Sequence, residues 1–303
     1  MTSIEEWGDK IHDNINQKEI AADIILEVIT ENNLRKRVEI SNYYQNKYGK
    51  TLFDEISNAK IETDFARCAS QLFLSPIEFC IHHLQIGLKK KNECVMEQLT
   101  SRSVDELKYI EDYYNKKTGK NLKDDILKTY SGAVGKNLVN LWNTKRTVNS
   151  NPKKEECEKY ANILISNKPK DWVEKEDIFK QIFIERSPEE LVLIARYYLK
   201  NSGKNLLDDI ENKTGGDHQL LLKEILYNNI MPHEIFADKM NKAMKGLGTD
   251  EETLSRALVS RCELDMNNIR DMYQTKYNKS LKDHIIDDTS KEYQKICLYL
   301  CQK

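Results

Sequence analysis

The segment Met244–Glu251 reads Met-Lys-Gly-Leu-Gly-Thr-Asp-Glu and places two glycines one residue apart. Gly246 and Gly248 carry no side chain, so the backbone here can turn sharply and direct carbonyl oxygens outward. A hard cation such as Ca²⁺ binds oxygens of this kind when a carboxylate completes the set. Asp288, 42 residues after Gly246, is the candidate carboxylate. From the residues alone, the alternative is a plain glycine turn that ends one helix, with Asp288 in solvent.

The composition indicates an all-α protein. Only 11 glycines and 5 prolines occur in 303 residues, while 32% of the residues are charged and 39% are hydrophobic. Few turn residues argue against β-structure. The core of such an all-α protein is expected to consist of thin layers between amphipathic helices. The net charge of −2 gives no overall field that would draw the chain to nucleic acid or anionic lipid. Membrane affinity must therefore come from local patches or from a bound cation.

The cysteines and the lack of targeting segments predict a cytoplasmic protein. Seven cysteines lie scattered without a C-x-x-C pair, as expected of small core residues in a reducing compartment. The N-terminal residues show no signal peptide, and no apolar run approaches membrane-spanning length.

A short pattern recurs four times: glycine or asparagine, lysine, any residue, leucine. The leucines stand 70, 84 and 75 residues apart, at Leu52, Leu122, Leu206 and Leu281. This spacing indicates four structural repeats. We place them at residues 1–75, 76–148, 149–231 and 232–303.

In the fourth repeat, apolar spacing predicts five helices. Thr249 and Glu252 are interpreted as a capping box that starts the second helix. The fourth helix is expected to bury Leu281, Ile285 and Ile286.

The loop, the distant acidic residue and the four repeats together resemble the annexin family over nearly the whole chain. The loss of glycine from three of the four corresponding loops is similar to the alpha-giardin group of protozoan annexins. The resemblance implies an all-α fold in which four repeats of five helices each form a slightly curved disc.

The same resemblance implies one calcium site that faces a membrane. Its expected donors are three carbonyl oxygens and one carboxylate, from Met244, Gly246, Gly248 and Asp288. A secondary site in this loop would use Thr249 and Glu251. In the first three repeats the position of Asp288 is taken by Ala59, Thr129 and Lys213. We therefore expect a single calcium site of this type.

Several loop residues are candidates for lipid contact. Leu247, Leu88 and Trp172 are aligned at loop tips, and a tryptophan there suits the bilayer interface. Three lysines, Lys89, Lys90 and Lys91, would attract anionic headgroups by about 1 kcal/mol each. The alternatives are a tryptophan packed on its own repeat and a solvated run of charge.

Glu97, Arg102 and Arg256 match the polar pairs that line the central channel in annexins. Buried ion pairs of this sort hold modules in register more than they add net stability. An ordinary surface charge is the alternative for each.

The function that follows is calcium-dependent binding to anionic phospholipid membranes. The expected protein is mostly monomeric in solution and attaches peripherally to the inner membrane face. The second hypothesis is a cytoskeleton-associated scaffold of the giardin type, with cytoskeletal proteins as partners. No H-E-x-x-H, G-x-S-x-G or P-loop motif occurs, so an enzyme is not expected. Nucleic-acid binding is also not expected, because the chain lacks both a basic charge and a stacking motif.

Overall fold

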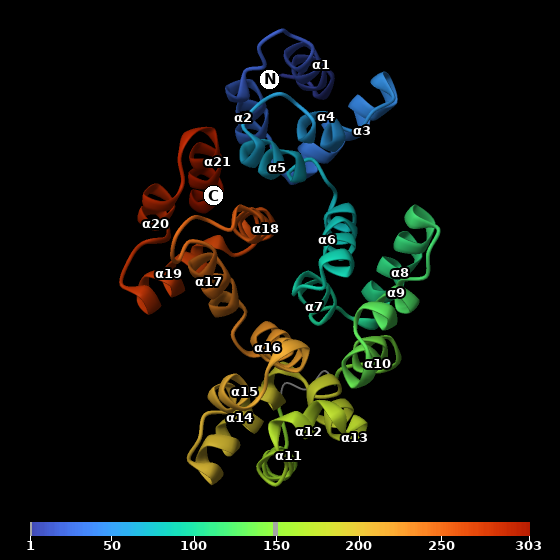
Figure 1. Cartoon of the computed structure of the whole chain (residues 1–303), viewed down its shortest axis with the longest axis vertical. Helices are drawn as coiled ribbons and strands as arrows, with labels where there is room; N and C mark the ends of the chain where they lie inside the picture. Colours follow the sequence, from blue (N-terminus) through green and yellow to red (C-terminus); the bar gives the residue numbers. More distant parts are fainter. Residues whose placement is uncertain (1, 148–150) are drawn as a thin grey trace. The chain divides into compact units, whose positions relative to one another are not determined.

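The computed structural model describes residues 2–147 and 151–303. Within these residues every regular element is a helix and no strand occurs, which confirms the all-α prediction. The chain divides into two compact units (Figure 1). The first contains Met1–Phe79 and His233–Lys303, and the second contains Cys80–Pro232. No helix of the described residues combines the length and the apolar character needed to span a membrane.

The first unit combines the beginning and the end of the chain, drawn in blue and in orange to red in Figure 1. Its N-terminal helices are α1 (Ile4–Ile15), α2 (Ala22–Glu31), α3 (Leu34–Tyr48), α4 (Leu52–Ser57) and α5 (Thr63–Gln71). Its C-terminal helices are α17 (Pro232–Ala243), α18 (Glu251–Arg261), α19 (Met266–Tyr277), α20 (Leu281–Asp288) and α21 (Lys291–Gln302). Helix α5 packs against α18 and α21, and the Glu62 carboxylate accepts a hydrogen bond from the Tyr293 N–H at 2.9 Å.

The second unit begins within α6. Its first helices are α6 (Pro76–Lys90), α7 (Cys94–Leu99), α8 (Val104–Thr118), α9 (Leu122–Thr129), α10 (Gly132–Asn140) and the 3₁₀ helix η1 (Leu141–Asn143). The remainder are α11 (Lys154–Ile165), α12 (Pro169–Glu174), α13 (Glu176–Ile178), the π-helix η2 (Phe179–Ile184), α14 (Pro188–Ser202), α15 (Leu206–Lys213) and α16 (Gly216–Ile230). Here α16 packs against α7 and α10. The first, second and fourth repeats each have a single helix at the second position, whereas the third repeat has α12, α13 and η2 in succession. This helix is interrupted because the backbone is extended at Lys175.

The recurring glycine-lysine pattern marks the end of a helix. Gly49, Gly119 and Gly203 follow α3, α8 and α14 with φ of 72°, 69° and 70°. A side chain disfavours this left-handed conformation, so glycine is the usual helix terminator there. Asn278 does the same after α19, with φ of 53°. The leucine of each pattern is buried and anchors the next helix.

Each unit thus joins two of the predicted repeats, the first with the fourth and the second with the third. The three boundaries after residues 75, 148 and 231 stay a prediction. The boundary between residues 148 and 149 lies outside the described residues.

One predicted core residue was wrong. Leu281 and Ile285 are buried, but the Ile286 side chain is 43% exposed. Successive residues of an α-helix point about 100° apart, so the face that buries Ile285 turns its neighbour outward.

Candidate calcium and lipid site

The loop between α17 and α18 is closed by one short hydrogen bond. The Asp250 N–H donates to the Ala243 carbonyl at 2.7 Å. Gly246 and Gly248 have φ of 116° and 83°, where a residue with a side chain would be strained. Leu247 between them is fully exposed, at 107% of its reference area. The loop therefore requires its glycines and presents a single leucine to solvent.

Asp288 lies against this loop although 39 residues separate it from Thr249. The Thr249 hydroxyl is 2.7 Å from Asp288 Oδ2 and 2.9 Å from the Asp288 carbonyl oxygen. Asp288 is half-buried and is the last residue of α20. The carbonyl groups at a helix C-terminus carry partial negative charge, which favours a cation at this place.

The predicted capping box at Thr249 and Glu252 was wrong. The residue that caps α18 is Asp250, whose carboxylate accepts a hydrogen bond from the Thr253 N–H at 3.0 Å. The Thr249 hydroxyl is instead directed to Asp288. Glu251 is the first residue of α18, and its carbonyl accepts a hydrogen bond from the Tyr293 hydroxyl at 3.1 Å.

The donors of the loop suit a hard cation. Within the described part of the chain, neither the Gly246 nor the Gly248 carbonyl accepts a hydrogen bond. These oxygens retain their lone pairs next to the half-buried Asp288 carboxylate, and Ca²⁺ prefers oxygen donors. No group of three or more His, Cys, Asp or Glu side chains with metal-binding geometry occurs among the described residues. A cation at this loop would therefore depend on backbone carbonyls for most of its protein ligands.

His284 supports the loop from α20, a contact that the sequence did not predict. Its ring hydrogen-bonds the Met244 backbone, and the Tyr273 hydroxyl contacts its Nδ1. Burial lowers the pKa of His284, and nearby Lys279 lowers it further. The other repeats gave a signal that could have identified it. There a tyrosine hydroxyl donates to an acid 11 residues later, in the pairs Tyr44–Glu55, Tyr114–Asp125 and Tyr198–Asp209.

The second repeat closes its loop with its own side chains. Thr129, at the position of Asp288, has its hydroxyl 3.3 Å from the Leu88 carbonyl and 2.9 Å from the Asp125 carbonyl. The Tyr130 hydroxyl donates to the Asn92 carbonyl at 2.8 Å. Two carbonyls that a cation would need here are thus already within reach of hydroxyl donors.

The predicted loop-tip position of Leu88 was wrong, because α6 continues to Lys90. Leu88 is half-buried on that helix. Lys89 and Lys90 lie exposed in its last turn, and Lys91 follows with φ of 52°. The Lys91 ammonium is 3.0 Å from the Asp217 carboxylate, so part of this charge is already compensated. Basic residues in a last helical turn also stabilise the helix itself.

The predicted exposure of Trp172 was wrong. Its side chain is 0% exposed and packs against Phe183 and Tyr198. The indole N–H is 3.1 Å from the Leu164 carbonyl and 3.2 Å from the Asn167 carbonyl. Alignment by loop length failed because α12 begins early, at Pro169, which is a favourable first helical residue. The buried indole thus donates to carbonyl oxygens at the C-terminal end of α11 and just after it.

In the first repeat an asparagine closes the corresponding loop. The Asn14 side chain accepts from the Ala21 N–H and donates to the Ala21 carbonyl, both at 3.0 Å. In the third repeat, Lys213 at the acidic position lies 2.6 Å from Asp209.

The three residues assigned to a channel differ in their surroundings. Glu97 and Arg256 are buried, at 7% and 1% exposure. Arg102 is exposed and lies 3.4 Å from the Glu106 carboxylate, with its Nε 3.3 Å from the Gln98 carbonyl. Their assignment to a central channel stays a prediction.

Comparison with known proteins agrees with this architecture. The annexin family model matches residues 81–141, 161–225 and 235–300. Mouse annexin A13 is 32% identical over 279 residues, which are 91% of this chain and 88% of that protein. Mouse annexin A6 is 33% identical over 281 residues, 91% of this chain and 42% of that longer protein.

Two solved structures show the same fold. Chicken annexin V in complex with Zn²⁺ superposes with a TM-score of 0.89 at 28% identity, covering 99% of this chain and 95% of that one. Calcium-bound alpha-14 giardin superposes with a TM-score of 0.80, and 99% of each chain is covered. At 16% identity, the giardin comparison shows the fold alone.

Proteins of the annexin type are generally non-enzymatic, bind phospholipid in a calcium-dependent manner and attach to membranes peripherally. The family model covers three segments that together make up most of this sequence, and the annexin A13 match extends over 91% of it. This chain belongs to the annexin family.

Proposed function

We propose that this protein binds anionic phospholipid membranes in a calcium-dependent manner through the loop between α17 and α18. The observation that carries the proposal is a contrast between the repeats. In the first three, Asn14, Thr129 with Tyr130, and Trp172 supply hydrogen bonds to the loop backbone. In the fourth, the Gly246 and Gly248 carbonyls are left open by the described residues.

Met244, Gly246, Gly248 and Asp288 are the residues that would hold the ion. When bound, Ca²⁺ supplies a positive charge that a lipid phosphate can approach, and it accepts six to eight oxygens, more than this loop offers. Asp288 provides the charge that offsets dehydration of a cation. The Thr249 hydroxyl orients that carboxylate toward the loop, and His284 holds the Met244 backbone. Lipid and calcium then strengthen each other's binding, because both contact the same surface.

Leu247 is the residue that would enter the membrane. It is fully exposed at the tip of the loop, so its contact with lipid would disturb no packing within the protein. Burying a leucine side chain stabilises association by about 1.5–3 kcal/mol. Thr249 and Glu251 would line a secondary cation position in the same loop.

Lys89, Lys90 and Lys91 would add adhesion that needs no calcium. They extend from the end of α6, at the loop of the second repeat that corresponds to the calcium loop. Because Lys91 is ion-paired with Asp217, the contribution of the three is expected to be less than their number suggests. This adhesion should weaken with salt.

Co-sedimentation with vesicles tests the proposal. Vesicles with and without phosphatidylserine are mixed with the protein in calcium and in a chelator. The expected result is strong pelleting that requires both phosphatidylserine and calcium, above a weaker, salt-sensitive fraction that phosphatidylserine pellets without calcium. Pelleting in the absence of both phosphatidylserine and calcium would contradict the proposal. Failure to pellet when both are present would contradict it as well.

The cytoskeletal scaffold is the other outcome of this experiment. A parallel sedimentation with polymerised actin and microtubules, in the chelator, measures it directly. Calcium-independent pelleting with a polymer, without vesicle binding, would favour the scaffold over the membrane function.

A further inference from the structure

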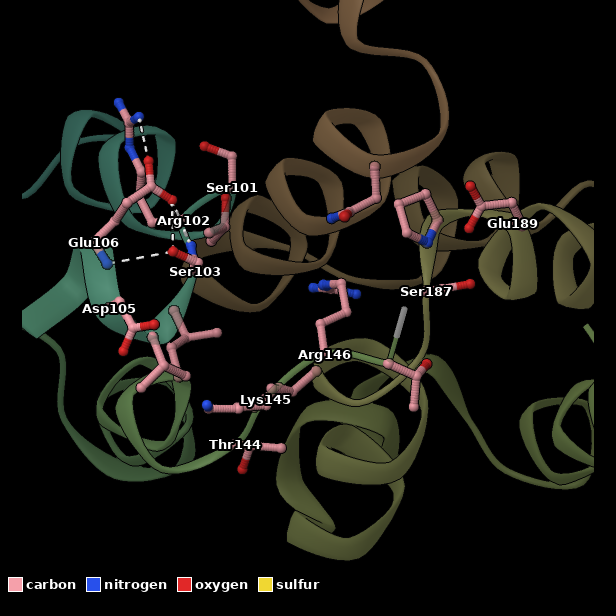
Figure 2. A pocket seen from close by; sticks show the side chains of 17 residues that line it. Ser101, Arg102, Ser103, Asp105, Glu106, Thr144, Lys145, Arg146, Ser187 and Glu189 are labelled. Carbon is pink, nitrogen blue, oxygen red and sulfur yellow. Dashed lines mark hydrogen bonds and ion pairs between the residues drawn. The ribbon is translucent and has the colours of Figure 1, made fainter. Parts of the chain in front are cut away.

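The second unit contains a cavity of about 550 Å³ that the proposed membrane site does not use. It lies between the α7–α8 junction and the η2–α14 junction (Figure 2). The segment Thr144–Thr147, which follows η1, runs along it. Its volume falls in the range of small-molecule sites, about 300–1,000 Å³.

Arg146 is the principal cation of this cavity. It is half-buried, and burial lowers its pKa to about 10. Its Nη1 donates to the Arg186 carbonyl at 2.6 Å, and its Nη2 donates to the Phe183 carbonyl at 3.0 Å. Among the described residues no carboxylate forms an ion pair with it. A guanidinium has five N–H groups, so donors remain for a ligand.

The first unit has a guanidinium at its corresponding junction, and there a carboxylate accompanies it. Arg37 donates to the Asn32 and Leu72 carbonyls at 2.6 and 2.9 Å. Its Nη2 also lies 2.8 Å from the Glu263 carboxylate. That carboxylate in addition accepts a hydrogen bond from the Leu34 N–H, the first of α3, at 2.9 Å. The junction between the first and fourth repeats is thus neutralised from within the chain.

In the second unit no carboxylate of the described residues pairs with Arg146 in this way. The Glu185 carboxylate is 3.3 Å from Arg186, not at Arg146. Arg146 is half-buried and has no counter-anion among the described residues, so an oxyanion that reached it would gain a charge-assisted hydrogen bond.

The rest of the lining narrows the chemistry of the ligand. Lys145 is exposed and adds a second positive charge beside Arg146. Asp105 and Glu189 also line the cavity, and Figure 2 shows them on opposite sides of Arg146. A ligand with several negative charges would meet these carboxylates. A small molecule with one oxyanion and one ammonium group satisfies both kinds of charge.

We infer that this cavity binds a soluble, metabolite-sized zwitterion, whose carboxylate or phosphate contacts Arg146 and Lys145 while its ammonium group contacts Asp105 or Glu189. The oxyanion pairs with Arg146 as the Glu263 carboxylate pairs with Arg37 in the first unit. The same chemistry occurs in a lipid headgroup, but the position of the cavity favours a free molecule. It lies at the C-terminal end of α7, whereas the loop of the second repeat lies at the N-terminal end of that helix.

Isothermal titration calorimetry with phosphorylethanolamine tests this inference on the full chain. A chelator is present, so the calcium loop does not contribute. Inorganic phosphate and ethanolamine are titrated separately. We expect phosphorylethanolamine to bind at least fivefold more tightly than inorganic phosphate, because only it satisfies both groups of charges. No binding of phosphorylethanolamine up to about 10 mM would overturn the inference.

Variants locate the binding. Lys145→Gln and Arg146→Gln should each weaken phosphorylethanolamine binding at least fivefold, and the Lys145 variant removes no contact that holds the fold. Lys136→Gln, an exposed lysine of α10 away from the cavity, is the matched control and should bind like the wild type. Replacing Asp105 by Asn and Glu189 by Gln together should reduce the preference over inorganic phosphate. Unchanged binding by Lys145→Gln, or weakening by Lys136→Gln of the same size, would refute the assignment.

An experiment with vesicles distinguishes a free molecule from a lipid headgroup as the ligand of the cavity. Vesicles of phosphatidylcholine with phosphatidylethanolamine, in chelator, should not pellet the protein or compete with phosphorylethanolamine. Competition by these vesicles would overturn the assignment to a free molecule. The result is independent of the calcium site, since all arms omit calcium.

Discussion

Replacing Asp288 by asparagine gives the sharpest test of the membrane proposal. The change removes one negative charge and keeps the size of the side chain. The fold should survive it, because Asn retains an oxygen that can accept from the Thr249 hydroxyl, now 2.7 Å from Asp288 Oδ2. The Asp288 carbonyl, 2.9 Å from the same hydroxyl, is unaffected. We therefore expect the free energy of unfolding to fall by no more than about 1 kcal/mol.

The loss of calcium affinity should be far larger. Asp288 is the only side-chain carboxylate assigned to the carbonyl set. A single negative charge and a divalent cation at about 2.4 Å attract each other by about 3.5 kcal/mol even at the dielectric constant of water. That energy corresponds to more than a hundredfold change in affinity. The calcium midpoint of vesicle binding should shift by at least this factor.

The neighbouring Asp287 provides a matched control. Its side chain is 66% exposed and lies 2.8 Å from the Lys279 ammonium. Asp287→Asn makes the same change in net charge, one residue away. Calcium titrations of both variants with phosphatidylserine vesicles decide the matter. An unaltered midpoint for Asp288→Asn, or equal shifts for both variants, would show that the working site lies elsewhere, with the Thr249 and Glu251 position as the next candidate.

Three further predictions test other parts of the structure. Leu247→Ala should weaken calcium-dependent vesicle binding about tenfold without lowering Tm, because this exposed side chain would contribute only to lipid contact. A vesicle titration equal to that of the wild type would contradict this role. Trp172→Phe should lower stability by about 1–3 kcal/mol in urea denaturation and leave vesicle binding intact, because the buried indole loses its bonds to backbone carbonyls; a vesicle-binding defect in a stable variant would refute it. Hydrogen bonds from Lys47 and Tyr48 lower the pKa of Asp9 from its usual 3.8 to about 2. The ionised carboxylate therefore stabilises the folded protein fully above pH 3.8, and this stabilisation is lost as the pH falls toward 2. Asp9→Asn should therefore lower Tm by a few degrees at neutral pH and flatten its decline between pH 4 and 2, and an unchanged acid profile would show that Asp9 is not coupled to folding.

The sequence was most informative where one residue type is required by the backbone. Gly49, Gly119 and Gly203 recur because the helix ends in a left-handed conformation, so their spacing revealed the repeats. The same reasoning identified Gly246 and Gly248, both with positive φ. The all-α class and the family followed from such positions together with the composition.

Side-chain direction was predicted less well, because it depends on where a helix begins. Trp172 was assigned to a loop tip by counting residues, but Pro169 starts α12 early and turns the indole into the core. Thr249 fits a capping box in sequence, but Asp250 competes for the same N–H groups and caps the helix. The contact of His284 with Met244 joins residues that are 40 positions apart, and no local pattern in the fourth repeat predicts it.

The repeats differ in how they satisfy the same loop, and the proposed function attributes the response to calcium to this difference. A hydroxyl, amide or indole donor from the chain closes a loop permanently, as Thr129, Asn14 and Trp172 do. The fourth loop presents two open carbonyls and one carboxylate, a set too small to complete the shell of a hard cation. Under the proposed function its affinity for calcium would be low until an outside oxygen contributes, and a membrane phosphate is such an oxygen. A single incomplete site makes binding depend on calcium and lipid together, because neither alone supplies enough ligands.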